Sequence, residues 1–140
     1  MILAITSVNI VYSEAKYSTV TGLVYHEFLK KIYEVLGERD YTIVMDIAPI
    51  HPSNPEFYHT YEYQVIFLPS YCPFTNPCED MFFQLKNSVR RNGNIRGNVD
   101  LTERMITACT EITTDNLQNY FRNSESFFQM CLNVEDIARE

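Results

Sequence analysis

The sequence predicts an α/β fold in one domain, and three observations lead to that prediction. Short apolar runs typical of strands alternate with segments whose apolar residues recur at helical spacing, in the order strand, strand, helix, strand, short helix, strand, then helices. Of the 140 residues, 46% are hydrophobic and 14% are aromatic, which is enough to fill one core. No repeat or low-complexity tract divides the chain, so we expect a single unit over residues 1–140.

The first elements are a hairpin and a helix. Residues 2–5 and 10–12 are apolar, β-branched or aromatic, and Asn9 marks a turn between them. From Thr21 the period changes, and Gly37 supplies a stop for the helix that follows. The apolar residues expected on one face of this helix are Val24, Phe28, Leu29, Ile32, Val35 and Leu36.

Two further strands are continuous apolar runs at residues 42–45 and 65–68. Such runs are typical of strands buried on both faces. The first run ends in Asp46 and Pro69 closes the second, with one or two helical turns expected around residues 57–61.

A helix is expected after the second of these strands. Asn76 is a good helix cap and Pro77 suits the first helical position. Glu79 and Asp80 then fall in the first turn, where the helix dipole favours negative charge. Apolar residues continue the helix over 82–89.

The rest of the chain is expected to be helical. A polar connector lies between Gly93 and Gly97, and a helix is expected over 101–112. Asp115 is a candidate cap for the next helix, and residues 127–137 suggest a last one. The inward residues of the helix after Asp115 should be Leu117, Tyr120 and Phe121.

Charge argues against a protein that coats nucleic acid. The net charge is −7, whereas stand-alone DNA- or RNA-coating proteins are normally basic. One local cationic segment nevertheless stands out because it contains no acid; its basic residues are Lys86, Arg90, Arg91 and Arg96.

The chain has no sign of secretion or of a membrane span. No apolar run approaches the roughly 18 residues that cross a bilayer, and the first residues lack a basic start. We therefore expect an intracellular protein. The four cysteines form no CxxC pair, which favours free thiols in a reducing compartment over a disulfide framework; they are Cys72, Cys78, Cys109 and Cys131.

Two carboxylates are candidate metal ligands by position. Asp46 ends a strand, at the edge where open α/β sheets bind ligands, and Glu79 lies in the first turn of the helix after the next strand. Two close carboxylates repel unless a cation such as Mg²⁺ lies between them. The alternatives are ordinary: an Asp after a strand is commonly a turn residue, and an acid in a first turn commonly serves the helix dipole.

The motifs around these acids resemble mariner-type transposases, which are DDE superfamily endonucleases with a ribonuclease H-like fold. The matching segments are VMDIAPIH at 44–51 and VIFLPSYCPFTNPCEDMFFQLK at 65–86. The family pattern is a strand ending in Asp-Asn-Ala-x-x-His, then Leu-Pro-Pro-Tyr-Ser-Pro and Asn-Pro-Ile-Glu before a helix. Residues 21–32 and 112–124 also resemble family segments.

The resemblance implies a mixed sheet flanked by helices, with a catalytic core over about 1–92 and a helical part over about 98–140. It implies that Asp46 and Glu79 are the second and third catalytic acids and hold Mg²⁺ or Mn²⁺. The family's first acid lies on a central strand upstream of the opening hairpin, so we expect an incomplete sheet and an amino-terminally truncated domain. The first acid of this chain, Glu14, falls in the next strand of the hairpin and does not fit that role.

The sequence departs from the family pattern at three motif positions. Ile47 replaces the usual Asn, Ser70 the second Pro and Cys78 an aliphatic residue. His51 matches the family His and would orient the site or contact phosphate, or it is a loop histidine bonded to the backbone. Tyr71 and Phe74 could stack on an unpaired base, although packing under the loop is favoured.

Three cations are candidates for contacts with DNA. Lys86 lies two helical turns beyond Glu79 on the same face, and Arg90 and Arg91 follow it. Such residues neutralise phosphates without reading sequence, whereas the alternative is a solvated helix end.

The resemblance as a whole implies metal-dependent cleavage and joining of DNA at transposon ends, in the nucleus if the source is eukaryotic. With one acid missing, we expect no activity from the chain alone. The alternative is a non-catalytic fragment that binds nucleic acid or protein. Its protein partner would be a second copy of the chain, giving a homo-oligomer, or a full-length transposase.

Overall fold

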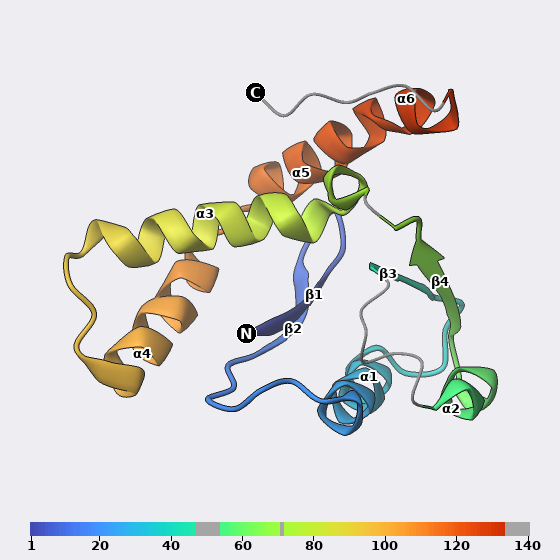
Figure 1. Ribbon diagram of the computed structural model, residues 1–140, viewed down its shortest axis with the longest axis horizontal. Helices are drawn as coiled ribbons and strands as arrows, with labels where there is room; N and C mark the ends of the chain where they lie inside the picture. Colours follow the sequence, from blue (N-terminus) through green and yellow to red (C-terminus); the bar gives the residue numbers. More distant parts are fainter. Residues whose placement is uncertain (47–53, 71, 134–140) are drawn as a thin grey trace.

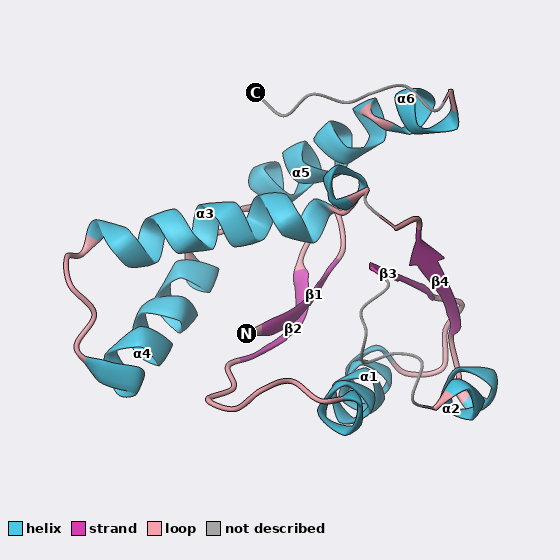
Figure 2. Cartoon of the chain, in the orientation of Figure 1, coloured by secondary structure: helices cyan, strands magenta, loops and turns pink. Residues whose placement is uncertain are grey.

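The computed structural model describes residues 1–46, 54–70 and 72–133. Two small sheets lie among helices, and the carboxyl-terminal part is helical (Figures 1 and 2). The strands are β1 (Ile2–Ile5), β2 (Ile10–Glu14), β3 (Thr42–Asp46) and β4 (Gln64–Leu68). The helices are α1 (Gly22–Leu36), α2 (Pro55–Thr60), a 3-10 turn η1 (Pro73–Thr75), α3 (Pro77–Arg91), α4 (Gly97–Thr110), α5 (Thr114–Ser126) and α6 (Phe128–Leu132).

The opening hairpin is confirmed. β1 pairs with β2 in antiparallel register, with Ile2 opposite Glu14. Asn9 forms the turn, because its carbonyl accepts from the Thr6 amide at 2.9 Å and its side-chain oxygen accepts from the Thr6 hydroxyl at 2.7 Å.

The second pair, β3 and β4, is parallel and forms a separate sheet. Among the described residues, no strand joins it to the β1–β2 pair. The mixed α/β class is therefore confirmed, and the two separate strand pairs are consistent with an incomplete ribonuclease H-like sheet.

The expectation that both apolar strands are buried on both faces is wrong. Val44 is 55% exposed and its register partner Ile66 is 46% exposed, whereas Met45 on the opposite face is buried. Burial on both faces requires a layer on each side of the sheet, and the described elements cover the Met45 side.

Helix α1 has the predicted ends. The Thr21 hydroxyl accepts from the Val24 amide, and Gly37 ends the helix with φ of 74°, a conformation that favours glycine. Val35 is 56% exposed, contrary to expectation, whereas the next residue, Leu36, packs against the core around this helix. The core around α1 is rich in aromatic side chains and consists of Ile2, Phe28, Leu29, Ile32, Tyr61 and Tyr63.

A second core lies under α3, α4 and α5. Strand β1 joins the two cores, because alternate residues of a strand point to opposite faces: Ile2 packs into the first core and Leu3 into the second. The other members of the second core are Met81, Leu85, Val89, Ala108, Leu117 and Tyr120. Leu117 and Tyr120 are thus inward as predicted, and Phe121 is half-buried.

The predicted cap at Asp115 is wrong. Thr113 is the N-cap of α5: its hydroxyl accepts from the Asn116 amide at 3.1 Å, and the Asn116 side chain accepts from the Thr113 amide at 3.0 Å. This reciprocal pair satisfies two free amides at once, so Asp115 falls in the first turn instead. The last helix, α6, covers only part of the expected 127–137 segment, and residues 134–137 lie outside the described residues.

No helix in the described part of the chain has the length and apolar character needed to cross a membrane.

Candidate functional site

Asp46 lies at the carboxyl end of β3 and is tied to the start of α3. Its Oδ2 accepts a hydrogen bond of 2.7 Å from the side-chain nitrogen of Asn76. Asn76 is the N-cap of α3, and its side-chain oxygen accepts from the Cys78 amide at 3.0 Å. A single amide side chain therefore joins the end of a strand to the beginning of a helix.

Glu79 lies in the first turn of this helix, three residues after the cap. Its amide donates to the Asn76 carbonyl at 3.0 Å, and its side chain is exposed. Both carboxylates act on the Cys78 thiol: burial, then the negative charges of Asp46 and Glu79, raise the pKa of Cys78 to about 12. Both acids therefore lie near enough to the Cys78 thiol for their charges to act on it.

Two other acids on or near these elements interact with other residues. Asp80 accepts a hydrogen bond of 2.7 Å from the Asn123 side chain, which directs its carboxylate towards α5. Glu14, at the end of β2, pairs with Lys16 at 2.5 Å and with Lys31 of α1 at 3.4 Å. Asp46 and Glu79 therefore remain the candidate metal ligands on these elements.

The two candidate acids offer some of the ligands that a hard divalent cation needs. Asp46 and Glu79 offer carboxylate oxygens, which Mg²⁺ and Mn²⁺ prefer. The nearby Cys78 thiol stays protonated at neutral pH, so it does not present a thiolate to a soft metal. Within residues 1–46, 54–70 and 72–133, no group of three or more His, Cys, Asp or Glu side chains is placed to hold a metal ion.

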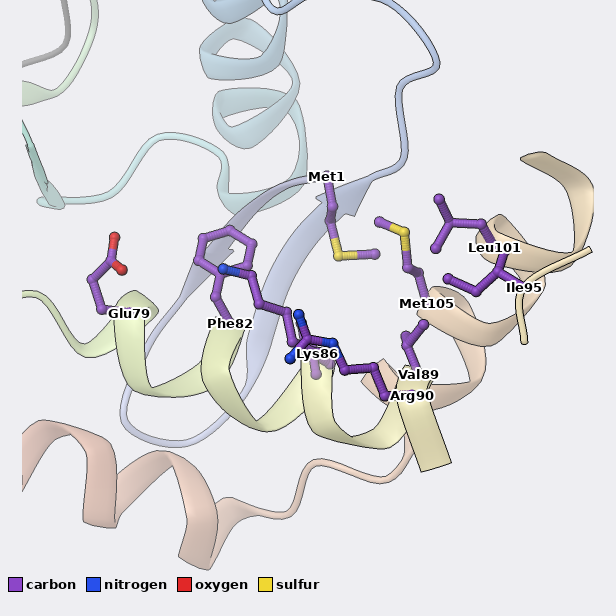
Figure 3. A pocket seen from close by; sticks show the side chains of 10 residues that line it. Met1, Glu79, Phe82, Lys86, Val89, Arg90, Ile95, Leu101 and Met105 are labelled. Carbon is purple, nitrogen blue, oxygen red and sulfur yellow. The ribbon is translucent and has the colours of Figure 1, made fainter. Parts of the chain in front are cut away.

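A cavity of about 520 Å³ extends along α3 from Glu79 (Figure 3). Lys86 and Arg90 line it, and both side chains are exposed. At 1.5 Å per residue, they lie ~10 and ~16 Å along the helix axis from Glu79. The rest of the wall is mostly apolar and includes Met1, Phe82, Leu101 and Met105.

The other predicted residues either lie elsewhere or are outside the described residues. Arg91 is exposed, does not line the cavity, and its Nη2 donates to the Ser88 hydroxyl at 3.4 Å. Phe74 packs on Phe127 with ring centroids 5.3 Å apart, which agrees with the packing alternative. His51, Tyr71 and Ile47 lie outside the described residues.

Sequence reasoning identified Asn76 as a cap but missed its second bond. A cap is a local feature, whereas the bond to Asp46 joins residues 30 positions apart. Cys78 was noted only as a departure from a motif, and its place near two carboxylates depends on how the end of β3 meets the start of α3. The sequence signal that was available is an amide cap residue three positions before Glu79.

Comparison with known proteins identifies the family of the chain. Residues 1–102 match the family described as DDE superfamily endonuclease, so the match includes both acids and all three cations and ends within α4. Neither the curated proteins nor the solved structures contain a significant match. Because the family match covers 102 of the 140 residues, the chain belongs to the DDE superfamily endonucleases.

Proposed function

We propose that this chain carries two of the three catalytic acids of a mariner-type transposase, whose reaction is metal-dependent cleavage and joining of DNA. The observation that supports this most directly is the Asn76 side chain, which holds Asp46 beside the first turn of α3. Asp46 and Glu79 would hold Mg²⁺ or Mn²⁺. When bound, such ions activate a water or a 3′-hydroxyl and stabilise the leaving oxygen.

The chain's own residues would hold the site and the substrate. Asn76 fixes the Asp46 carboxylate, and the cavity row of Lys86 and Arg90 would bind DNA phosphates on the side of α3 that carries Glu79. A DNA backbone bound by Lys86 and Arg90 would pass Glu79 at a fixed distance.

The third carboxylate would come from a strand upstream of the opening hairpin, as the family pattern implies. Glu14 pairs with two lysines and Asp80 is turned towards α5, so neither is free to complete the set. We therefore propose that the chain as given is a truncated domain that does not cut DNA alone. The catalytic part would be about residues 1–92 and the helical part about 98–140. The protein would act in the nucleus if the source is eukaryotic.

Metal binding is tested by titrating Mn²⁺ and following its electron paramagnetic signal. Asp46→Asn and Glu79→Gln should each weaken binding at least tenfold, because each removes one of two charged ligands. Glu62→Gln, a change at an exposed acid outside the site, is the matched control and should leave binding unchanged. Equal binding in all four proteins would refute the metal site.

Cleavage is tested with a chimera. An added segment bearing an Asp-containing strand should give Mg²⁺- or Mn²⁺-dependent nicking of plasmid DNA that Asp46→Asn abolishes, whereas the chain alone should not nick. A chimera that folds and stays inert would favour the alternative: a fragment that binds nucleic acid or pairs with a full-length relative. The lack of activity would then be attributed first to the departures from the family pattern, which are Ile47, Ser70 and Cys78.

DNA binding is tested by fluorescence anisotropy on a short duplex over a range of salt concentration. Lys86→Ala and Arg90→Ala should each weaken binding and lower the log–log salt slope by about 1. Arg91→Ala is the matched control, because Arg91 lies outside the cavity row. An equal effect of all three changes would show that the cations act only through net charge.

A further inference from the structure

A pair of cysteines lies beside the segment that leads to the site. Cys72 immediately precedes η1, and its carbonyl accepts from the Thr75 hydroxyl at 2.6 Å and from the Thr75 amide at 3.1 Å. Cys131 lies in α6, which is 59 positions away in the sequence (131 − 72). Both side chains are half-buried, so neither is sealed from solvent.

Two contacts align these cysteines. The Cys131 amide donates to the Phe127 carbonyl at 3.0 Å, so Phe127 and Cys131 lie one turn apart on the same side of the chain. Phe127 packs on Phe74 with ring centroids 5.3 Å apart. That contact brings Phe127, at the start of α6, to the η1 turn that follows Cys72.

The Cys131 thiol is also affected by Cys72. The pKa of Cys131 is raised by desolvation of its thiol, then by a side-chain hydrogen bond and a charge interaction with Cys72. This electrostatic effect agrees with the ring contact, because both place Cys131 near Cys72. All four cysteines are free in this structure.

We propose that Cys72 and Cys131 form an intramolecular disulfide when the chain meets a low-molecular-weight disulfide such as oxidised glutathione. One cysteine thiolate attacks the glutathione disulfide and releases a first glutathione; the second cysteine then attacks the mixed disulfide and releases another. The two cysteine sulfurs are oxidised, the two glutathione sulfurs are reduced, and the two thiol protons end on the two glutathiones. The bond locks α6 onto the segment that runs from Cys72 to Asn76.

The lock would act on the site through a short path. Between Cys72 and the Asn76 cap lies only η1, whose backbone is already held by the Cys72 carbonyl. Fixing Cys72 to α6 therefore restricts the segment that positions Asn76 against Asp46. The disulfide can be detected without DNA or metal, so its presence is tested independently of the proposed endonuclease role.

The experiment is oxidation of the full chain with oxidised glutathione, followed by thiol titration and a non-reducing tryptic map. Free thiols should fall from four to two, and the map should link the peptides 40–86 and 123–139. Because peptide 40–86 also contains Cys78, the double variant Cys78→Ser/Cys109→Ser should give the same link. Its thermal midpoint should rise by roughly 5–15 °C on oxidation and return after reduction.

Cys72→Ser and Cys131→Ser are the matched controls and should show neither the link nor the thermal shift. A map that pairs Cys72 with Cys78, four thiols that persist, or glutathione retained on both cysteines would overturn the proposal. The Cys78→Ser/Cys109→Ser variant keeps the test decisive if a single serine variant fails to fold, because it retains both cysteines of the pair.

Discussion

Replacing Asn76 by Ala should loosen both the fold and the proposed metal site. The change removes the cap of α3, which typically costs about 1 kcal/mol. It also removes the 2.7 Å bond to Asp46, which we set at about 1 kcal/mol because the pair is only partly buried. The expected loss of unfolding free energy is therefore about 2 kcal/mol. For 140 residues this lowers the thermal midpoint by about 7 °C.

A double-mutant cycle with Asp46→Ala separates the two contributions. The loss of the cap is common to both backgrounds and cancels, so the coupling energy from urea unfolding reports the Asp46–Asn76 bond and should be about 1 kcal/mol. Asn76→Asp retains a good cap but sets a second carboxylate against Asp46. It should therefore destabilise the chain near neutral pH and recover as the carboxylates are protonated.

The control is Asn123→Ala, which removes an exposed amide-to-carboxylate bond of the same 2.7 Å length to Asp80. Its cost should be below about 0.5 kcal/mol. Mn²⁺ binding should weaken in Asn76→Ala, although both proposed ligands remain, and stay unchanged in Asn123→Ala. A coupling energy below about 0.3 kcal/mol, or full Mn²⁺ affinity in Asn76→Ala, would refute the view that this amide positions Asp46.

Three further changes test the packing. Desolvation lowers the pKa of buried His26, so the unfolded chain takes up the proton first as pH falls below about 6.5, and stability is lost towards pH 5. The thermal midpoint of His26→Phe should therefore fall less over this range than that of the wild type. Exposed His59→Gln is the control. Arg104→Ala removes three hydrogen bonds to carbonyls around the end of α3 and should cost about 2 kcal/mol in urea, against less than about 0.5 for Arg122→Ala. Tyr61→Phe removes a buried 2.5 Å bond to a carbonyl of α1 and should lower the urea midpoint by an amount worth about 1 kcal/mol; an unchanged midpoint would contradict the buried bond.

Helix ends could be predicted wherever the determining interaction is local. Thr21 and Asn76 each bond to an amide two or three residues ahead, so the sequence contains the whole motif. The same holds for α5, where the wrong choice of Asp115 overlooked the Thr113–Asn116 capping box. That error concerned which of several good cap residues is used, and the reciprocal amide bond decides it.

Burial of strand faces could not be predicted in the same way. The run over 42–45 is apolar throughout, and an apolar run indicates a strand without saying what covers it. Val44 and Ile66 point to one side of the β3–β4 pair and Met45 to the other, and only the packing of distant elements distinguishes the two sides. The place of Asp46 followed from the end of the run, but its tie to Asn76 depends on that same packing.

Helix α3 determines which substitutions can be interpreted as changes in function. Its buried stripe, at spacing of four, is Met81, Leu85 and Val89, and these residues hold the second core. Lys86 and Arg90 lie on the cavity side and are exposed, so replacing them removes charge without opening the core, and a loss of DNA binding can be attributed to the surface. Asn76 differs because one side chain serves both the helix and Asp46. A change there alters stability and site geometry together, which is why a cycle, and not a single variant, is needed to assign its role.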